Sequence, residues 1–227
     1  MRQGGTMMGQ VAEKTVPQVK SAAEPSKGER TRERIMDLAE ESILHKGFAA
    51  TSIEELVEAA GITKSGFFYH FKDKNDLARA IVARFVVRDD AHLDRLTARA
   101  RALSDDPLQS FLIFIRLFAE MMDDLPGVHP GCLAASITYQ DRAFDGEVSR
   151  LIRLAAEGWR ARFHDWLKEI ADVYPPRLPA DLEAMADHFN VVADGGIITS
   201  RALGDKTILG RQVRLMHDHV KLLFDGR

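Results

Sequence analysis

The sequence predicts an all-α fold of about nine helices. From Lys27 onward, apolar residues recur at intervals of three and four, which is the spacing of one face of an α-helix. No segment alternates apolar and polar residues as a half-buried strand does. Capping pairs, glycines and prolines divide this periodic stretch into pieces of helical length.

Composition narrows the class of protein further. The 227 residues are 45% hydrophobic, which is enough for a sizeable core. A single cysteine excludes an intramolecular disulfide framework and fits a reducing compartment, so a cytoplasmic location is expected. No run approaches the roughly 18 apolar residues of a membrane span, so no membrane partner is expected. The net charge is −3, so any binding of nucleic acid must come from a local arrangement of charges.

Three segments are expected along the chain. Residues 1–26 have no sustained period and are interpreted as a flexible arm. Residues 27–73 are expected to form a compact unit of three helices, the first of which starts at the Ser26-x-x-Glu29 capping box. Residues 74–227 carry longer helices with larger side chains and are expected to form a second, larger domain.

Two short helices are predicted in the middle of the smaller unit. Thr51 and Glu54 have capping-box spacing and start a helix of about eight residues, which ends where Gly61 suits a left-handed cap. Thr63 caps a second helix that runs through His70. Two short helices joined by a tight turn form a helix-turn-helix, which sets its second helix into the DNA major groove.

Six more helices are expected in the larger domain. The first begins at Lys74 behind a capping Asp73, and the next begins at Pro107 after Asp106. The others are expected at 132–139, around 151–170, at 181–203 and at 206–224.

Aromatic residues fall on two faces of the helix that follows Thr63. Phe67 and Phe71 are four residues apart, so they share a face and are predicted to pack in the core. Phe68 lies beside Lys64, one turn earlier, on the side that would face the groove. Lys64 can donate to guanine O6 and N7. The predicted DNA contacts on this helix are Thr63, Lys64, Ser65, Gly66, Phe68, Tyr69 and His70.

Charges beside this helix favour opposite conclusions. Lys72 and Lys74 add positive charge without reading sequence. Glu54, Glu55 and Glu58 on the preceding helix would lie badly against phosphate unless they are turned away from it. A three-helix unit that binds no DNA therefore stays an alternative.

The segment TSIEELVEAAGITKSGFFYHFKDKNDLARAI, Thr51–Ile81, resembles the DNA-binding segment of the TetR family of bacterial one-component repressors. The resemblance implies an all-α homodimer whose helix-turn-helix binds a palindromic operator. It also implies a C-terminal domain that binds a small ligand and releases the DNA. Carried over by position, the base readers are Lys64 and Ser65. The implied backbone contacts are Thr51, Ser52, Phe68, Tyr69, His70 and Lys74.

One position departs from the family pattern. The family usually has a tyrosine where this chain has Phe68, so the phosphate hydrogen bond expected there is lost. Apolar contact with a sugar or a thymine methyl would remain. Tyr69 is a candidate to supply a replacement hydroxyl.

The larger domain contains a dense set of apolar side chains that predicts either a solid core or a cavity for an apolar or aromatic effector. The candidate ligand contacts are Phe111, Phe114, Phe118, Met122, Cys132, Trp159, Phe163 and His188. G-x-S-x-G, H-E-x-x-H, C-x-x-C and glycine-rich phosphate loops are all missing from the sequence, so no enzyme activity, cofactor or metal is expected.

Cys132 supports a separate hypothesis. It follows Pro130 and Gly131 at a predicted helix start, where amide dipoles would lower the pKa of the thiol. This pattern is consistent with a regulator that responds to thiols or electrophiles. The alternative is a buried, inert cysteine.

The last two helices predict a dimer. Paired glycines inside an apolar helix indicate a close approach by another helix. The apolar stripe of the final helix would then be covered by a second chain in a four-helix bundle. The expected interface residues are Gly195, Gly196, Leu209, Val213, Met216 and Val220. Such a dimer would present its two recognition helices about 34 to 36 Å apart. A helical interaction protein without operator binding would share this stripe and stays open.

Overall fold

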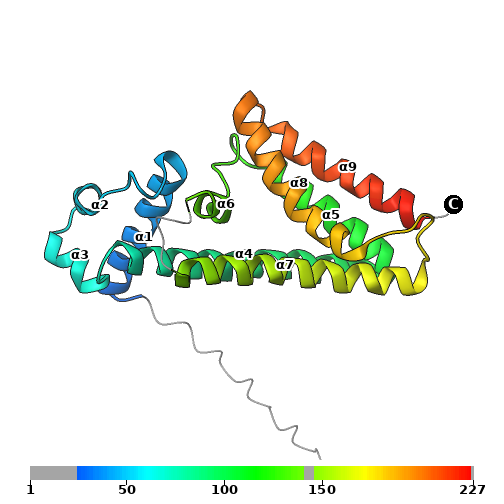
Figure 1. Cartoon of the computed structure of the whole chain (residues 1–227), viewed down its shortest axis with the longest axis horizontal. Helices are drawn as coiled ribbons and strands as arrows, with labels where there is room; N and C mark the ends of the chain where they lie inside the picture. The colour runs from blue at the N-terminus through cyan, green and yellow to red at the C-terminus, as the bar shows by residue number, and fades with distance from the viewer. Residues whose placement is uncertain (1–24, 141–145, 226–227) are drawn as a thin grey trace, which may run out of the picture.

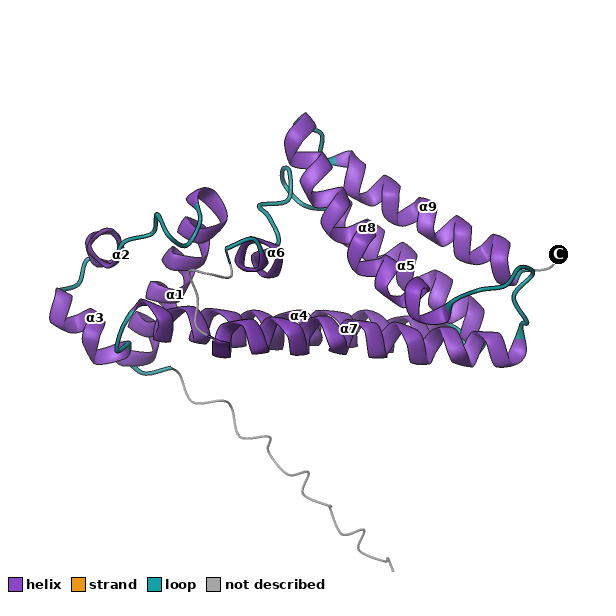
Figure 2. Cartoon of the chain, in the orientation of Figure 1, coloured by secondary structure: helices purple, strands orange, loops and turns teal. Residues whose placement is uncertain are grey.

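The computed structural model describes residues 25–140 and 146–225. Within these ranges the chain forms nine α-helices and no strand, which confirms the all-α prediction (Figures 1 and 2). The helices are α1 Lys27–Lys46, α2 Ile53–Ala60, α3 Lys64–His70, α4 Lys74–Leu103, α5 Pro107–Asp123, α6 Leu133–Thr138, α7 Gly146–Val173, α8 Leu182–Leu203 and α9 Thr207–Phe224. The predicted arm, residues 1–26, lies outside the described residues except for its last two. None of the described helices could span a membrane.

The helices gather into two groups joined by α4. Helices α1–α3 lie at one end of the molecule, and α5, α8 and α9 stand over the other end of the long α4 and α7 pair (Figure 1). The start of α4 contributes Leu77 and Ile81 to the core of α1–α3, whereas Leu93 and Ala100 belong to the larger core. A boundary at residue 74 therefore divides the chain by helix, but α4 is shared between the two cores.

An ionic cluster fastens α1 to α4. The Arg84 guanidinium, only 14% exposed, donates to carboxylates of Glu33, Asp37 and Glu40 on α1 at 2.7–2.8 Å. Arg88 donates to the same Glu40 at 2.6 Å. Charge-assisted hydrogen bonds of this kind hold two helices in one relative orientation.

Two helix starts differ in how they are capped. The predicted capping box of Ser26 and Glu29 is present at α1. At α2 the predicted Thr51 cap is wrong, because Ser52 accepts the amide of Glu55 instead. Thr51 lies one residue before the cap and turns into the α1–α2 loop, where its hydroxyl donates to the Gly47 carbonyl at 3.0 Å.

Candidate nucleic-acid interface and effector region

The turn between α2 and α3 sets the geometry of the candidate interface. Gly61 adopts the left-handed conformation, φ 62° and ψ 39°, and its amide closes the end of α2. Such a backbone favours glycine because it has no side chain to clash. Thr63 then caps α3, with its hydroxyl accepting the Gly66 amide at 3.1 Å. These two contacts fix the direction in which α3 leaves the turn.

The faces of α3 separate as the helical spacing predicts. Phe67 and Phe71 are 0% and 1% exposed and pack into the small core, which confirms their predicted role. Phe68 and Tyr69 are 45% and 84% exposed. His70 is half-buried beside them, with its ring 5.0 Å from the Tyr69 ring. Buried anchors on one side therefore leave the polar and aromatic side open to a partner.

Lys64 stands exposed at the start of α3, where its ammonium donates to Glu54 at 2.7 Å. This hydrogen bond lowers the pKa of the Glu54 carboxyl. Glu55 is paired in the same way with Lys46. Two of the three acidic side chains on α2 that would repel phosphate are thus paired with lysines. Exposed pairs are weak, so Lys64 stays available to another acceptor.

Two of the predicted phosphate contacts are engaged inside the chain. Thr51 is only 2% exposed, so a phosphate cannot reach its hydroxyl in this conformation. The Lys74 ammonium donates to the carbonyls of Phe48 and Ala49 and lies 4.2 Å from the centre of the Phe48 ring. Burial lowers the pKa of Lys74. Lys74 therefore ties the start of α4 to the α1–α2 loop. Ser52 remains exposed at the start of α2.

The helix-turn-helix lies inside a region that matches a known family. The family model described as "Bacterial regulatory proteins, tetR family" matches residues 35–81, from α1 into α4. The chain belongs to the TetR family. It is a transcriptional regulator whose DNA-binding unit is the helix-turn-helix of α2 and α3.

Curated relatives agree with this assignment. This TetR-family chain is 23% identical to the transcriptional regulator AcuR of Cereibacter sphaeroides over 164 residues, which cover 71% of the chain and 72% of AcuR. It is 41% identical to the HTH-type transcriptional regulator AcrR of Shigella flexneri, over 22% of the chain and 23% of AcrR. The shorter match, to AcrR, has the higher sequence identity.

A solved structure extends the likeness to the fold. The crystal structure of a TetR-family transcriptional regulator from Agrobacterium tumefaciens superposes with a TM-score of 0.70. The superposition covers 85% of this chain and 98% of that protein at 21% sequence identity. The superposition therefore extends beyond the helix-turn-helix into the helices of the larger domain.

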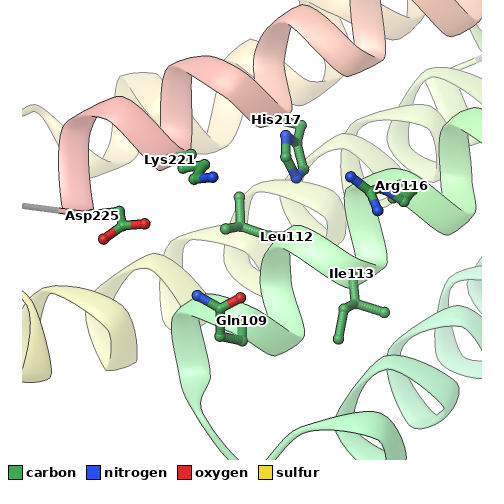
Figure 3. Close-up of a pocket in the computed structure, with 7 residues that line it drawn as sticks. All are labelled: Gln109, Leu112, Ile113, Arg116, His217, Lys221 and Asp225. Atoms are coloured by element: carbon green, nitrogen blue, oxygen red, sulfur yellow. The ribbon is translucent and has the colours of Figure 1, made fainter. Parts of the chain in front are cut away.

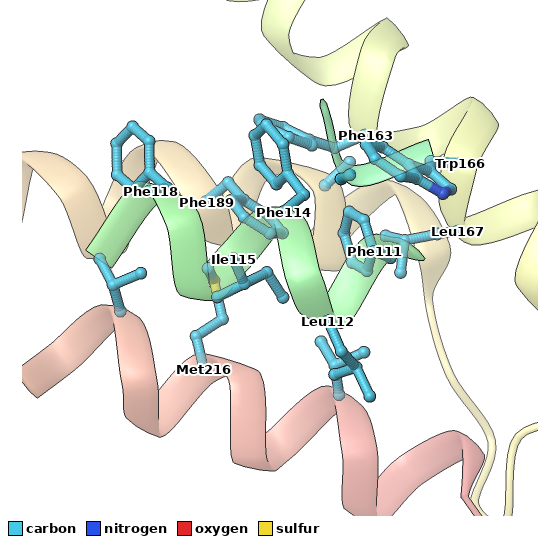
Figure 4. Packing of buried hydrophobic residues seen from close by; sticks show 14 of the residues in the cluster. Phe111, Leu112, Phe114, Ile115, Phe118, Phe163, Trp166, Leu167, Phe189 and Met216 are labelled. Carbon is cyan, nitrogen blue, oxygen red and sulfur yellow. The ribbon is translucent and has the colours of Figure 1, made fainter. Parts of the chain in front are cut away.

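The aromatic side chains of the larger domain form a solid cluster (Figure 4). The Phe163 ring stacks on Phe189 with ring centres 4.0 Å apart, and Phe111 lies 5.0 Å from Trp166. Where these rings pack against one another, no space remains between them for a ligand. The predicted ligand contacts that are buried in this way are Phe111, Phe114, Phe118 and Phe163. For these residues the structure favours the core alternative.

Phe189 is the member of this cluster that the sequence interpretation missed. It lies on α8, stacks on Phe163 of the preceding α7, and has its ring centre 5.4 Å from that of Phe111 on the more distant α5. The spacing of Met185, Ala186 and Phe189 indicates a buried face of α8, whereas the neighbouring His188 was predicted as a polar ligand contact.

Three other candidate ligand contacts lie at the edge of the core. Met122 and Trp159 are half-buried and pack against it, and the Trp159 indole donates to Asp89 at 2.5 Å. His188 lines a separate, mainly apolar pocket of about 370 Å³ between the α7–α8 loop, α8 and α9. The His219 ring, also in that pocket, lies 6.4 Å from the His188 ring. His188 is therefore not packed inside the aromatic cluster, but lines a pocket at its edge to which Phe189 of the cluster also contributes.

Cys132 caps α6, with its sulfur accepting the Ala135 amide at 3.4 Å. Burial, together with the nearby Asp194 carboxylate, raises the pKa of the thiol to about 12. The predicted lowering of this pKa is therefore wrong. The dipole of a six-residue helix is outweighed by the loss of water around the sulfur.

The predicted dimer stripe is covered by its own chain. Leu209, Val213, Met216 and Val220 are 1–4% exposed and pack in the larger core. A Cβ on Gly196 would stand 3.2 Å from the Leu209 Cα, so this glycine serves the approach of α8 to α9 within one chain. These five residues are corrected from interface to core. One chain covers them because α9 packs along both α5 and α8.

A different apolar stripe stays exposed. Gly195 has open space around it, and it shares one face of α8 with exposed Val191 and Ile198. On α9, Leu215 and Leu222 are 62% and 68% exposed, seven residues apart. We call these five residues the outer stripe. Residues spaced by three, four and seven form one continuous helical face.

Proposed function

We propose that the chain is a ligand-responsive repressor that binds a palindromic operator as a homodimer. The observation that carries this proposal is the exposed start of α3, where Lys64 and Ser65 stand free of the core on a helix held down by Phe67 and Phe71. That arrangement suits insertion into a major groove.

The residues around α3 divide into base readers and backbone contacts. Lys64 is suited to guanine, because its ammonium can donate to O6 and N7 together. Ser52 and Thr63 carry exposed hydroxyls at two helix starts, where free amides also attract phosphate. Tyr69 and His70 would contact the backbone on the far side of the groove, while exposed Phe68 would pack on sugar or a thymine methyl.

The effector proposed here is a small apolar molecule in the pocket beside His188. Leu167, Met185 and Phe189 provide an apolar lining, and His188 with His219 provides polar contacts. Because α4 contributes to both cores and is clamped to α1 by Arg84, a change in packing of the larger domain would be carried to the helix-turn-helix. Release of DNA follows if the effector favours the orientation that does not fit the operator.

The dimer proposed here forms through the outer stripe of Val191, Gly195, Ile198, Leu215 and Leu222. Two copies of this α8–α9 face would make a four-helix bundle and bury side chains that one chain leaves in water. A two-fold axis through this bundle would relate the two α3 helices, so a palindromic operator is expected.

The proposal can be tested by selecting bound duplexes from a randomised DNA library with the full-length chain. We expect the selected sequences to be palindromic. Lys64→Ala should then lower affinity for the selected duplex by about 1–3 kcal/mol and relax the preference at one base position, because a base contact is lost. Lys168→Ala, which removes an exposed lysine on α7, is the matched control.

Two results would contradict the proposal. Recovery of no enriched sequence would favour the helical interaction protein, which shares the outer stripe but does not need Lys64. Equal losses for Lys64→Ala and Lys168→Ala would mean that charge alone is responsible, and that α3 does not read bases.

A further inference from the structure

We infer that an open groove between α5 and α9 is a binding site for a small organic monocarboxylate. The groove has a volume of about 460 Å³ and lies on the flank of α9 that faces α5 (Figure 3). Its lining residues are Gln109, Leu112, Ile113, Arg116, His217, Lys221 and Asp225. The site is separate from the helix-turn-helix, from the His188 pocket and from the outer stripe, so the inference goes beyond the proposed function.

Three nitrogen-bearing side chains of the groove converge on one region. Figure 3 shows the nitrogen-bearing ends of Arg116, Lys221 and His217 pointing toward the space above Leu112. Neither Arg116 nor Lys221 forms an ion pair in residues 25–140 and 146–225. Elsewhere on these helices arginine finds a carboxylate, as Arg214 does with Asp123. The unpaired cations therefore offer charge-assisted hydrogen bonds to an anion.

The rest of the groove selects among anions. Leu112 and Ile113 supply apolar surface beside the cations, which favours a ligand with an apolar body over a hydrated inorganic ion. Asp225 lies toward the end of the groove beyond Lys221, where a second carboxylate would be repelled (Figure 3). Gln109 can donate to or accept from a neutral polar group. These contacts together specify one carboxylate joined to a short apolar body.

The inference can be tested by titrating benzoate into the full-length chain and measuring heat and backbone amide shifts. We expect saturable binding at millimolar concentration or below, with the largest shifts at residues 109–116 and 217–225. Benzamide has the same shape without the charge and should bind at least about tenfold more weakly, because an ionic hydrogen bond is lost. Inorganic phosphate tests whether charge alone is sufficient.

Variants locate the site. Arg116→Gln and Lys221→Gln should each weaken benzoate binding about tenfold or more, since each removes a charged donor. Arg153→Gln removes an exposed arginine on α7 outside the groove and should leave binding unchanged. Circular dichroism would verify that each variant is folded. Arg116 and Lys221 are both exposed, so neither substitution is expected to disturb the fold. If one variant nevertheless fails to fold, the other still tests the site.

Three outcomes would overturn the inference. Benzoate that does not saturate would show that the groove is no site. Benzamide or phosphate binding as tightly as benzoate would contradict the assignment of the ligand as an organic monocarboxylate. An equal effect of Arg153→Gln would mean that net charge, and not Arg116 or Lys221, governs binding. None of these measurements uses DNA, so failure here is distinct from failure of operator binding.

Discussion

At the scale of single residues, helical position decides which aromatic side chains are available to a partner. Phe67 and Phe68 are neighbours in sequence, yet one is fully buried and the other is 45% exposed. Their rings meet edge to face with centres 5.4 Å apart, so the buried ring supports the exposed one. Phe68 is therefore exposed but supported by a buried ring. We expect a substitution of Phe68 to change DNA affinity more than the stability of the fold.

Restoring the missing hydroxyl at this position is expected to tighten DNA binding. Phe68→Tyr should raise affinity for all duplexes by about 0.5–1.5 kcal/mol, because a phosphate hydrogen bond carries no base information. Fluorescence anisotropy with the selected operator and a scrambled duplex would measure both affinities. Tyr69→Phe is the paired control, and a loss there would show that Tyr69 supplies the replacement hydroxyl. Unchanged affinity in Phe68→Tyr would indicate that no phosphate lies within hydrogen-bonding distance of a hydroxyl at residue 68.

Cys132 is expected to be inert at neutral pH. Because burial raises the pKa of its thiol from 9.0 to about 12, the native chain holds almost no thiolate. Native protein at pH 8 should therefore react with iodoacetamide more slowly than denatured protein, which mass spectrometry can measure at this single cysteine. A native rate equal to or above the denatured rate would reinstate the thiol-responsive alternative.

The same pKa predicts how stability depends on pH. The unfolded thiol ionises near pH 9 whereas the folded one stays protonated, so the unfolded state is stabilised relative to the folded state as pH rises from about 9 toward 12. The contribution of Cys132 is fully present below pH 9 and is lost above it. Comparing urea denaturation of the wild type and Cys132→Ala at pH 8 and pH 10 would isolate this loss. An identical difference at both pH values would contradict it.

At the scale of helices, two adjacent glycines on α8 serve different partners. A Cβ on Gly196 would stand 2.7 Å from Leu209 Cδ1 and 3.2 Å from Leu209 Cα, whereas a Cβ on Gly195 meets nothing within 4 Å. Gly196 thus belongs to the contact between α8 and α9. Gly195 belongs to the outer stripe, where none of the described residues packs on it and where we propose that a second chain does.

Alanine at these two positions should have opposite effects. Gly196→Ala should destabilise the chain by about 1–3 kcal/mol through overpacking. Gly195→Ala should stabilise the isolated chain by about 0.5–1 kcal/mol, because alanine favours the helix and nothing in that chain lies within 4 Å of the added Cβ. Urea denaturation at two protein concentrations would compare them. A loss in Gly195→Ala that appears only at the higher protein concentration would support the proposed dimer, because a partner helix would then pack against Gly195. Similar, concentration-independent losses for both variants would contradict the assignment.

At the scale of the whole molecule, α4 and the loop before α6 connect the two groups of helices. The thirty residues of α4 run through both cores. In the loop before α6, Arg201 of α8 donates to the Pro130 carbonyl, and the adjacent Gly131 lies against Leu44 of α1. The α8–α9 end is therefore linked to α1 by a second route. If an effector binds the proposed pocket beside α8, we expect its effect to reach the helix-turn-helix through these connections.

The assembly itself is expected to depend on the outer stripe. Ile198→Glu and Leu215→Glu should convert a dimer into a monomer, because two carboxylates would be buried without partners in the bundle. Analytical ultracentrifugation at micromolar concentration would measure this, and operator affinity should fall with it. Val173→Glu, at an exposed apolar residue ending α7, is the control. A wild-type chain that stays monomeric at this concentration would contradict the proposed dimer.

Local patterns in the sequence determined the helices and the helix-turn-helix. Capping at Ser26 and Thr63, the glycine after α2 and the four-residue spacing of Phe67 and Phe71 are interactions within a few residues, so sequence alone specifies them. Only the tertiary structure decided which apolar stripes are covered, since coverage depends on helices distant in sequence. Leu209 is therefore core and Leu215 surface, although both are leucines on α9. Cys132 shows the same limit, because burial by distant helices outweighed the local dipole.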